Sequence, residues 1–135
     1  MSLKKSSFPE EKIRISLLEF MKKELGYPSG VISVERSLSS LPHLKGQKVP
    51  NRRFDIAVFS KENFKPLLII ECKAVPITKK CYDQIIGYNH LVQVPFIAIA
   101  NQQGVITLLK EKDSYKKIIG LPNYNYLLEI GRGWN

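Results

Sequence analysis

The chain has 135 residues and a formal net charge of +9, with 44% hydrophobic and 24% charged residues. A chain of this length can bury enough apolar surface to fold as one domain without disulfides or a structural metal. No apolar run approaches the roughly 18 residues that cross a membrane, and the amino-terminal stretch lacks the apolar core of a signal peptide. We therefore expect one cytoplasmic domain over residues 1–135 with no membrane partner.

The first expected element is a helix over residues 9–25. Pro9 suits a first helical turn. Leu17 and Met21 belong to an apolar stripe near helical spacing, and Gly26 follows the last stripe residue, as is typical of a helix end.

Strands and a second helix are expected after this helix. The apolar runs "RRFDIAVF" and "LLIIECKAV" are joined by the short polar link "SKENFK", which favours a hairpin. A Ser-, Pro- and Gly-containing stretch, 39–50, favours a loop, and the run "VPFIAIA" is apolar on both sides, as in a strand buried on both faces. The pattern predicts strands over 31–38, 52–59, 66–72, 94–100 and 104–110, and a helix over 78–92.

This order, α-β-β-β-α-β-β, predicts an α/β fold with a central mixed sheet flanked by helices. The helix between the third and fourth strands permits a right-handed crossover. In the remaining segment, 111–135, the apolar residues around Leu127 favour either a strand or a short helix. Cys72 and Cys81 form no CxxC pair and have no matched histidines, so both are expected to be reduced and free of zinc.

Basic residues gather in two places. The stretch "KGQKVPNRR" contains no acid, and a lysine pair opens the second helix. Such clusters attract polyanions, of which nucleic acid is the commonest inside a cell; a solvated surface is the equally simple alternative. The candidate nucleic-acid contacts from charge are Lys45, Lys48, Arg52, Arg53, Lys79 and Lys80.

Three charged residues lie in or beside the two apolar runs. Glu71 and Lys73 are two residues apart, so they point to one face of a strand. If the two runs pair as a hairpin, Asp55 can lie near Glu71. Two close carboxylates repel unless a cation or proton lies between them, and Mg²⁺ prefers such oxygen ligands. The alternative is an ordinary salt-bridge set with Arg52 or Arg53.

These residues, in this order, resemble the PD-(D/E)xK nuclease superfamily. The closer resemblance is to the small nuclease domain at the N-terminus of type I restriction enzyme R subunits and to stand-alone bacterial relatives. It rests on "PEEKIR", "LGYP", "VERSL", "RRFDIAVF", "LLIIECKA" and "YDQIIGYNHLVQVPFIAIAN". It covers about residues 8–110, leaves 111–135 as a C-terminal extension, and implies a restriction-endonuclease-like α-β-β-β-α-β core.

The resemblance also implies roles for particular residues. Asp55, Glu71 and the backbone carbonyl of Cys72 would bind Mg²⁺ or Mn²⁺, and Lys73 would be the catalytic lysine. Glu11 resembles an acid that reaches the metal through water, although a favourable charge in a first helical turn explains it equally well.

Two helix residues complete the implied site. Gln84 and Tyr88 resemble residues that line the site or contact the nucleic-acid backbone, with helix packing as the alternative, above all for Tyr88. Arg14 fits the family pattern, and Glu35 is a recurrent acid without an assigned role.

Two departures limit what the resemblance implies. Phe54 stands where the superfamily name has proline, at a position that varies widely. The phosphate loop G-x-x-x-x-G-K-[ST] is missing. We therefore expect a stand-alone domain or a fragment, with a motor or specificity subunit in trans or a second copy as compatible partners.

Three functions follow from these observations. The first is a Mg²⁺-dependent endonuclease that hydrolyses phosphodiester bonds of DNA. The second is a non-catalytic nucleic-acid-binding or protein-interaction domain that retains the nuclease fold. The third is a structural domain in which arginine bridges the two carboxylates. The sequence leaves open the form of the nucleic acid, the oligomeric state and the pathway.

Overall fold

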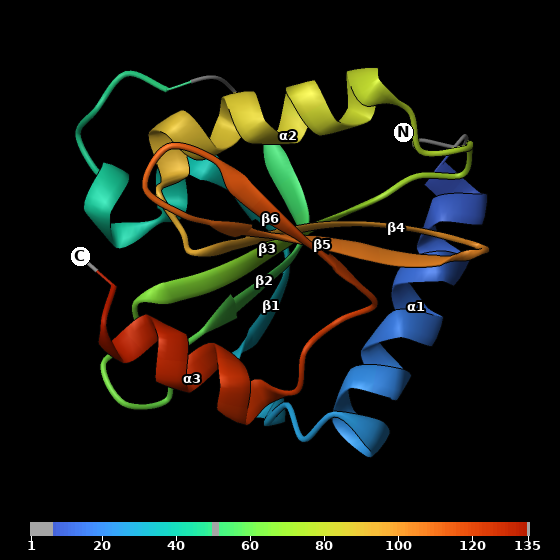
Figure 1. Cartoon of the computed structure of the whole chain (residues 1–135), viewed down its shortest axis with the longest axis horizontal. Helices are drawn as coiled ribbons and strands as arrows, with labels where there is room; N and C mark the ends of the chain where they lie inside the picture. The colour runs from blue at the N-terminus through green and yellow to red at the C-terminus, as the bar shows by residue number, and fades with distance from the viewer. Residues whose placement is uncertain (1–6, 50–51, 135) are drawn as a thin grey trace.

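The computed structural model describes residues 7–49 and 52–134. Figure 1 shows a central sheet with α2 above it and α3 below it in this view, and α1 at its side. The elements in chain order are α1 (Ser7–Glu24), η1 (Ser29–Val31), β1 (Ile32–Ser37), η2 (Leu38–Ser40), η3 (Pro42–Leu44), β2 (Arg53–Phe59), β3 (Pro66–Cys72), α2 (Lys79–Val92), β4 (Phe96–Asn101), β5 (Gly104–Lys110), β6 (Tyr115–Ile119) and α3 (Tyr124–Arg132).

The six strands form one mixed sheet in the order β1-β2-β3-β4-β5-β6. All neighbours are antiparallel except β3 and β4, which are parallel and are joined through α2. Parallel neighbours need such a long connection, which usually contains a helix. The predicted mixed α/β sheet and the β2–β3 hairpin are therefore confirmed.

The centre of the sheet forms the core. In β4 the first five residues are buried, which confirms the prediction from its continuous apolar sequence. Helix α1 buries Leu17 and Met21 and contacts β3 and β4. Both cysteines are free thiols. In the part of the chain that the structure describes, no helix is long and apolar enough to cross a membrane.

Two segments are more regular than the sequence predicts. The described part of the expected loop 39–50 contains the 3₁₀ turn η3 and part of η2. The C-terminal extension adds both a strand and a helix, because β6 pairs with β5 and α3 follows it. Of the two alternatives around Leu127, the short helix is the correct one. Asn123 starts α3 by accepting a hydrogen bond from the N–H of Tyr126 at 3.0 Å.

Strand β4 begins two residues later than predicted. The side chain of Asn89, at the end of α2, pairs with both backbone groups of Val94 at 2.9 and 3.0 Å. These bonds occupy the groups that the sheet would otherwise use. The chain therefore enters the sheet only at Phe96.

Candidate functional site

The β2–β3 hairpin places Asp55 and Glu71 on neighbouring strands. Ile56 pairs with Ile70, so the next pair in this register is Asp55 and Glu71, and opposite residues of antiparallel strands share one face. Asp55 Oδ2 also accepts a hydrogen bond from the backbone N–H of Cys72 at 2.6 Å. The structure thus brings the two carboxylates together, as the hairpin predicts.

Glu71 is a buried carboxylate whose pairing is incomplete. It is 7% exposed, and its Oε1 lies 3.7 Å from the Arg52 guanidinium. Its Oε2 is buried without a hydrogen-bond partner among the described residues. Burial, and then the nearby charge of Asp55, raise the pKa of Glu71 to about 8. Positive charge placed beside this carboxylate would therefore be strongly favoured.

Asp55 and Lys73 belong to the same electrostatic cluster. Burial raises the pKa of Asp55, while the hydrogen bond from Cys72 and the charges of Arg14 and Lys73 lower it. The charge of Lys73 also lowers the pKa of Glu71. The backbone N–H of Lys73 donates to the carbonyl of Ala100 in β4 at 2.8 Å, which fixes the lysine at the end of β3.

Arg52 reaches into this cluster. Its guanidinium carbon lies 4.5 Å from the centre of the Tyr88 ring, and its Nε is buried without a hydrogen-bond partner among the described residues. The sequence predicts Arg52 either in a basic surface patch or in a salt bridge with the carboxylates, and Tyr88 either against nucleic acid or in helix packing. In the structure they contact each other beside Glu71. An arginine therefore does reach the site, but it contacts one oxygen of one carboxylate.

The acids of α1 have different neighbours. Glu11 is exposed and pairs with Arg14 at 3.5 Å. Arg14 also pairs with Glu35 of β1 at 2.6 Å. Glu10, which the sequence analysis passed over, is half-buried, and its negative charge raises the pKa of Glu71. Glu10 and Glu11 are adjacent in "PEE", so the sequence showed that either of them could face the sheet and approach Glu71.

A small cavity lies next to Asp55, between α1 and the first two strands. Its volume is about 200 Å³. It is lined by Glu10, Glu11, Arg14, Glu35, Arg53, Phe54 and Asp55. Glu35 adopts a positive φ of 52° in the middle of β1, which is an uncommon backbone conformation for a residue other than glycine.

The other predicted contacts lie on the surface. Gln84 is exposed on α2, one turn before Tyr88. Lys79 pairs with Asp83 at 2.8 Å, and the exposed Arg53 lies 3.9 Å from Glu35. The remaining lysines of the set, Lys45, Lys48 and Lys80, are exposed.

The donor set suits a hard cation. Asp55 and Glu71 offer carboxylate oxygens, one of them buried and unpartnered. Burial raises the pKa of the Cys72 thiol, so that residue could contribute its backbone carbonyl but no thiolate. Over residues 7–49 and 52–134, no three His, Cys, Asp or Glu side chains gather closely enough to hold a metal. Mg²⁺ keeps several waters and is often bound through one or two carboxylates.

Comparison with known proteins gives one family. A search of curated proteins gave no match. The family model described as type I restriction enzyme R protein N terminus matches residues 9–122. This match spans most of the chain and includes Asp55, Glu71 and Lys73. The chain therefore belongs to the family of type I restriction enzyme R protein N-terminal domains.

Proposed function

We propose that this domain is a Mg²⁺- or Mn²⁺-dependent nuclease that hydrolyses phosphodiester bonds of DNA. The observation that carries the proposal is the buried Glu71 carboxylate. Its pKa is raised to about 8 beside a second carboxylate, and one of its oxygens has no partner among the described residues. Perturbed carboxyl groups of this kind are typical of functional sites. The family name supports a role in restriction, and the expected PD-(D/E)xK relationship agrees with it.

Each residue has a chemical role in this proposal. Asp55 and Glu71 would hold the cation, and the hydrogen bond from Cys72 keeps the Asp55 carboxylate in place. A divalent cation bound there would supply positive charge to the phosphate and lower the pKa of a bound water. Lys73, fixed at the end of β3, would orient the attacking water and stabilise the negative charge that develops on the phosphate.

The basic surface would hold the DNA backbone without reading bases. Lys45, Lys48 and Lys80 are exposed and available to phosphates, whereas Lys79 is paired with Asp83. Gln84 is exposed on α2, about one turn after Lys80, and would contact the DNA backbone. A motor or specificity subunit in trans, or a second copy of the chain, would supply what this domain lacks for paired or sequence-specific cuts.

One observation favours a second function, a non-catalytic binding domain that retains the fold. Arg52 already lies 3.7 Å from Glu71, and the described side chains offer only two carboxylates at this point. If the arginine serves as the permanent counter-ion of Glu71, the site needs no metal. The domain would then bind nucleic acid or a partner protein through its basic surface.

The two functions separate in a paired assay of metal binding and cleavage. Lys73→Ala should lower DNA cleavage by about 10²- to 10⁴-fold and leave Mn²⁺ binding largely intact. Asp55→Asn should lose both. Suitable substrates are supercoiled, linear, single-stranded and branched DNA, and Lys61→Ala, in the distant β2–β3 turn, is the matched control. If either site variant cut DNA at the wild-type rate, these roles would be wrong.

A further inference from the structure

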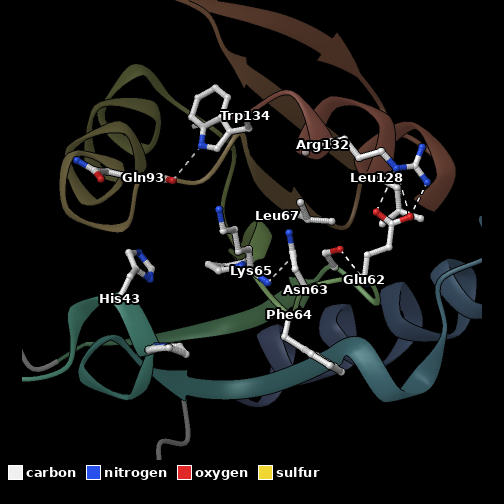
Figure 2. A pocket seen from close by; sticks show the side chains of 14 residues that line it. His43, Glu62, Asn63, Phe64, Lys65, Leu67, Gln93, Leu128, Arg132 and Trp134 are labelled. Carbon is white, nitrogen blue, oxygen red and sulfur yellow. Dashed lines mark hydrogen bonds and ion pairs between the residues drawn. The ribbon is translucent and has the colours of Figure 1, made fainter.

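A cavity of about 380 Å³ lies at the other end of the β2–β3 hairpin. Figure 2 shows it between the hairpin turn, η3, the end of α2 and the end of α3. Leu67 lines it at the start of β3, whereas Glu71 lies four residues further along the strand. At about 3.3 Å per residue this is roughly 13 Å. The cavity is therefore separate from the candidate metal site.

The apolar part of the wall is held in a fixed geometry. Trp134 donates its indole N–H to the carbonyl of Gln93 at 3.3 Å. His43 pairs through a ring nitrogen with the carbonyl of Val92 at 2.6 Å. Both rings thereby satisfy carbonyls at the C-terminal end of α2. A preformed and mainly apolar cavity of this size is typical of small-molecule sites.

Two of the polar side chains that line the cavity, Asn63 and Lys65, can donate hydrogen bonds to a ligand. Asn63 Oδ1 accepts from the backbone N–H of Lys65 at 3.0 Å, so its amide NH₂ is left to donate. Figure 2 shows the Lys65 side chain extending toward Trp134. The nearby Arg132 is neutralised by Glu62, with contacts of 2.6, 3.1 and 3.2 Å. The charge available to a ligand is thus the single ammonium of Lys65.

We propose that this cavity binds a small organic anion with a planar, apolar body, of the class of the aromatic carboxylates. The ring would lie against Trp134, Leu67 and Leu128, and the carboxylate would accept from Lys65 and Asn63. Burial of the ring supplies the hydrophobic gain, and a charge-assisted hydrogen bond sets the preference for an anion.

This proposal does not depend on nuclease activity. Leu128, Arg132 and Trp134 lie beyond residue 122, where the family match ends. Part of the wall is therefore built by a segment to which the family model assigns nothing. Loss of the metal site by Glu71→Gln should leave ligand binding unchanged, so the two proposals can fail separately.

The single tryptophan of the chain makes the test direct. Because Trp134 lines the cavity, its one indole N–H resonance reports on occupancy. Benzoate, the neutral benzamide and the cationic benzylamine would be titrated into the full chain while this resonance is followed. We expect a saturable shift with benzoate, and affinities weaker by about tenfold or more for the other two, the size of one charge-assisted hydrogen bond.

A pair of lysine variants sharpens the result. Lys65→Met keeps the apolar stem and removes the charge, and should weaken benzoate binding by about tenfold. Lys61→Met, in the same turn but outside the cavity lining, should bind as the wild type does. Equal affinities for the three probes, no saturable shift, or equal binding by both variants would overturn the proposal. A shift with dAMP but none with benzoate would likewise overturn it, because it would indicate a nucleotide site.

Discussion

The two ends of the β2–β3 hairpin differ in whether their buried polar groups are hydrogen-bonded. At the turn, Tyr124 accepts a hydrogen bond from the N–H of Lys61 and donates one to the carbonyl of Phe59, each at 2.8 Å. At the other end, Glu71 and Arg52 each keep a buried atom without a partner among the described residues.

This difference separates an end whose hydrogen bonds stabilise the fold from the end that carries the proposed metal site. A buried polar group left unpaired costs about 1–3 kcal/mol, and natural proteins contain few of them. The turn end pairs its groups and so holds α3 against the sheet. The carboxylate end retains a cost that a bound cation would reduce, which is why we place the proposed metal site there.

The largest expected effect on stability comes from the Glu71 carboxylate. Its pKa in the folded protein is about 8, against an ordinary value of 4.5, so the folded state holds the proton more tightly than the unfolded state. Without divalent cations, the free energy of unfolding should therefore fall as pH rises from about 4.5 to about 8. The loss should reach several kcal/mol, since each pKa unit corresponds to about 1.4 kcal/mol.

Glu71→Gln should remove this dependence and make the protein more stable than the wild type above about pH 8. Denaturant unfolding across this pH range would measure it, with the exposed Glu19→Gln in α1 as the control. If the wild type and Glu71→Gln showed the same change in the free energy of unfolding over this pH range, the assignment would be wrong.

A smaller effect is expected at the turn end. Tyr124→Phe removes the hydroxyl, so the N–H of Lys61 and the carbonyl of Phe59 both lose this hydrogen-bond partner. It should destabilise the fold by about 1–3 kcal/mol, measured by chemical denaturation. Tyr126→Phe, on the same helix, is the matched control, because its ring still packs against Phe96. If the two variants cost the same, the hydrogen bonds of Tyr124 would not be what secures this end.

Two glycines should give the smallest effects, of opposite sign. A Cβ at Gly131 would clash with the Cδ2 methyl of Leu67, which would have to shift to make room for it. Gly131→Ala should cost about 1–2 kcal/mol. Gly87 in α2 has open space around its Cα, and Gly87→Ala should stabilise by about 0.5–1 kcal/mol. Thermal unfolding of both would show whether the close contact is real; equal stabilisation would argue against it.

The central strands could be predicted because their sequence has one simple explanation. Runs such as "LLII" in β3 and "FIAIA" in β4 are buried on both faces, so their pattern depends little on context. Strand β6 was missed because Lys116 and Lys117 are exposed at the edge of the sheet. Edge strands commonly carry such charges, so the segment shows no alternation of apolar and polar residues that would predict a strand.

The candidate site could be predicted only in part. Asp55, Glu71 and Lys73 follow from strand alternation and hairpin pairing, which are local rules. The salt bridge of Arg52 with Glu71 was one of two alternatives that the sequence left open, whereas the contact of Arg52 with Tyr88 depends on how α2 packs near the sheet. The proximity of Glu10, rather than Glu11, to Glu71 depends on the rotation of α1. Neither quantity can be read from residue spacing.

A calorimetric titration of Mn²⁺ into metal-free wild-type protein and into Glu71→Gln tests the central claim most directly. We expect saturable binding to the wild type and none to the variant, because Glu71→Gln removes the buried carboxylate oxygen that has no partner among the described residues. Equal binding by both proteins, or binding by neither even with DNA present, would contradict a metal site at Glu71 and favour the non-catalytic binding domain.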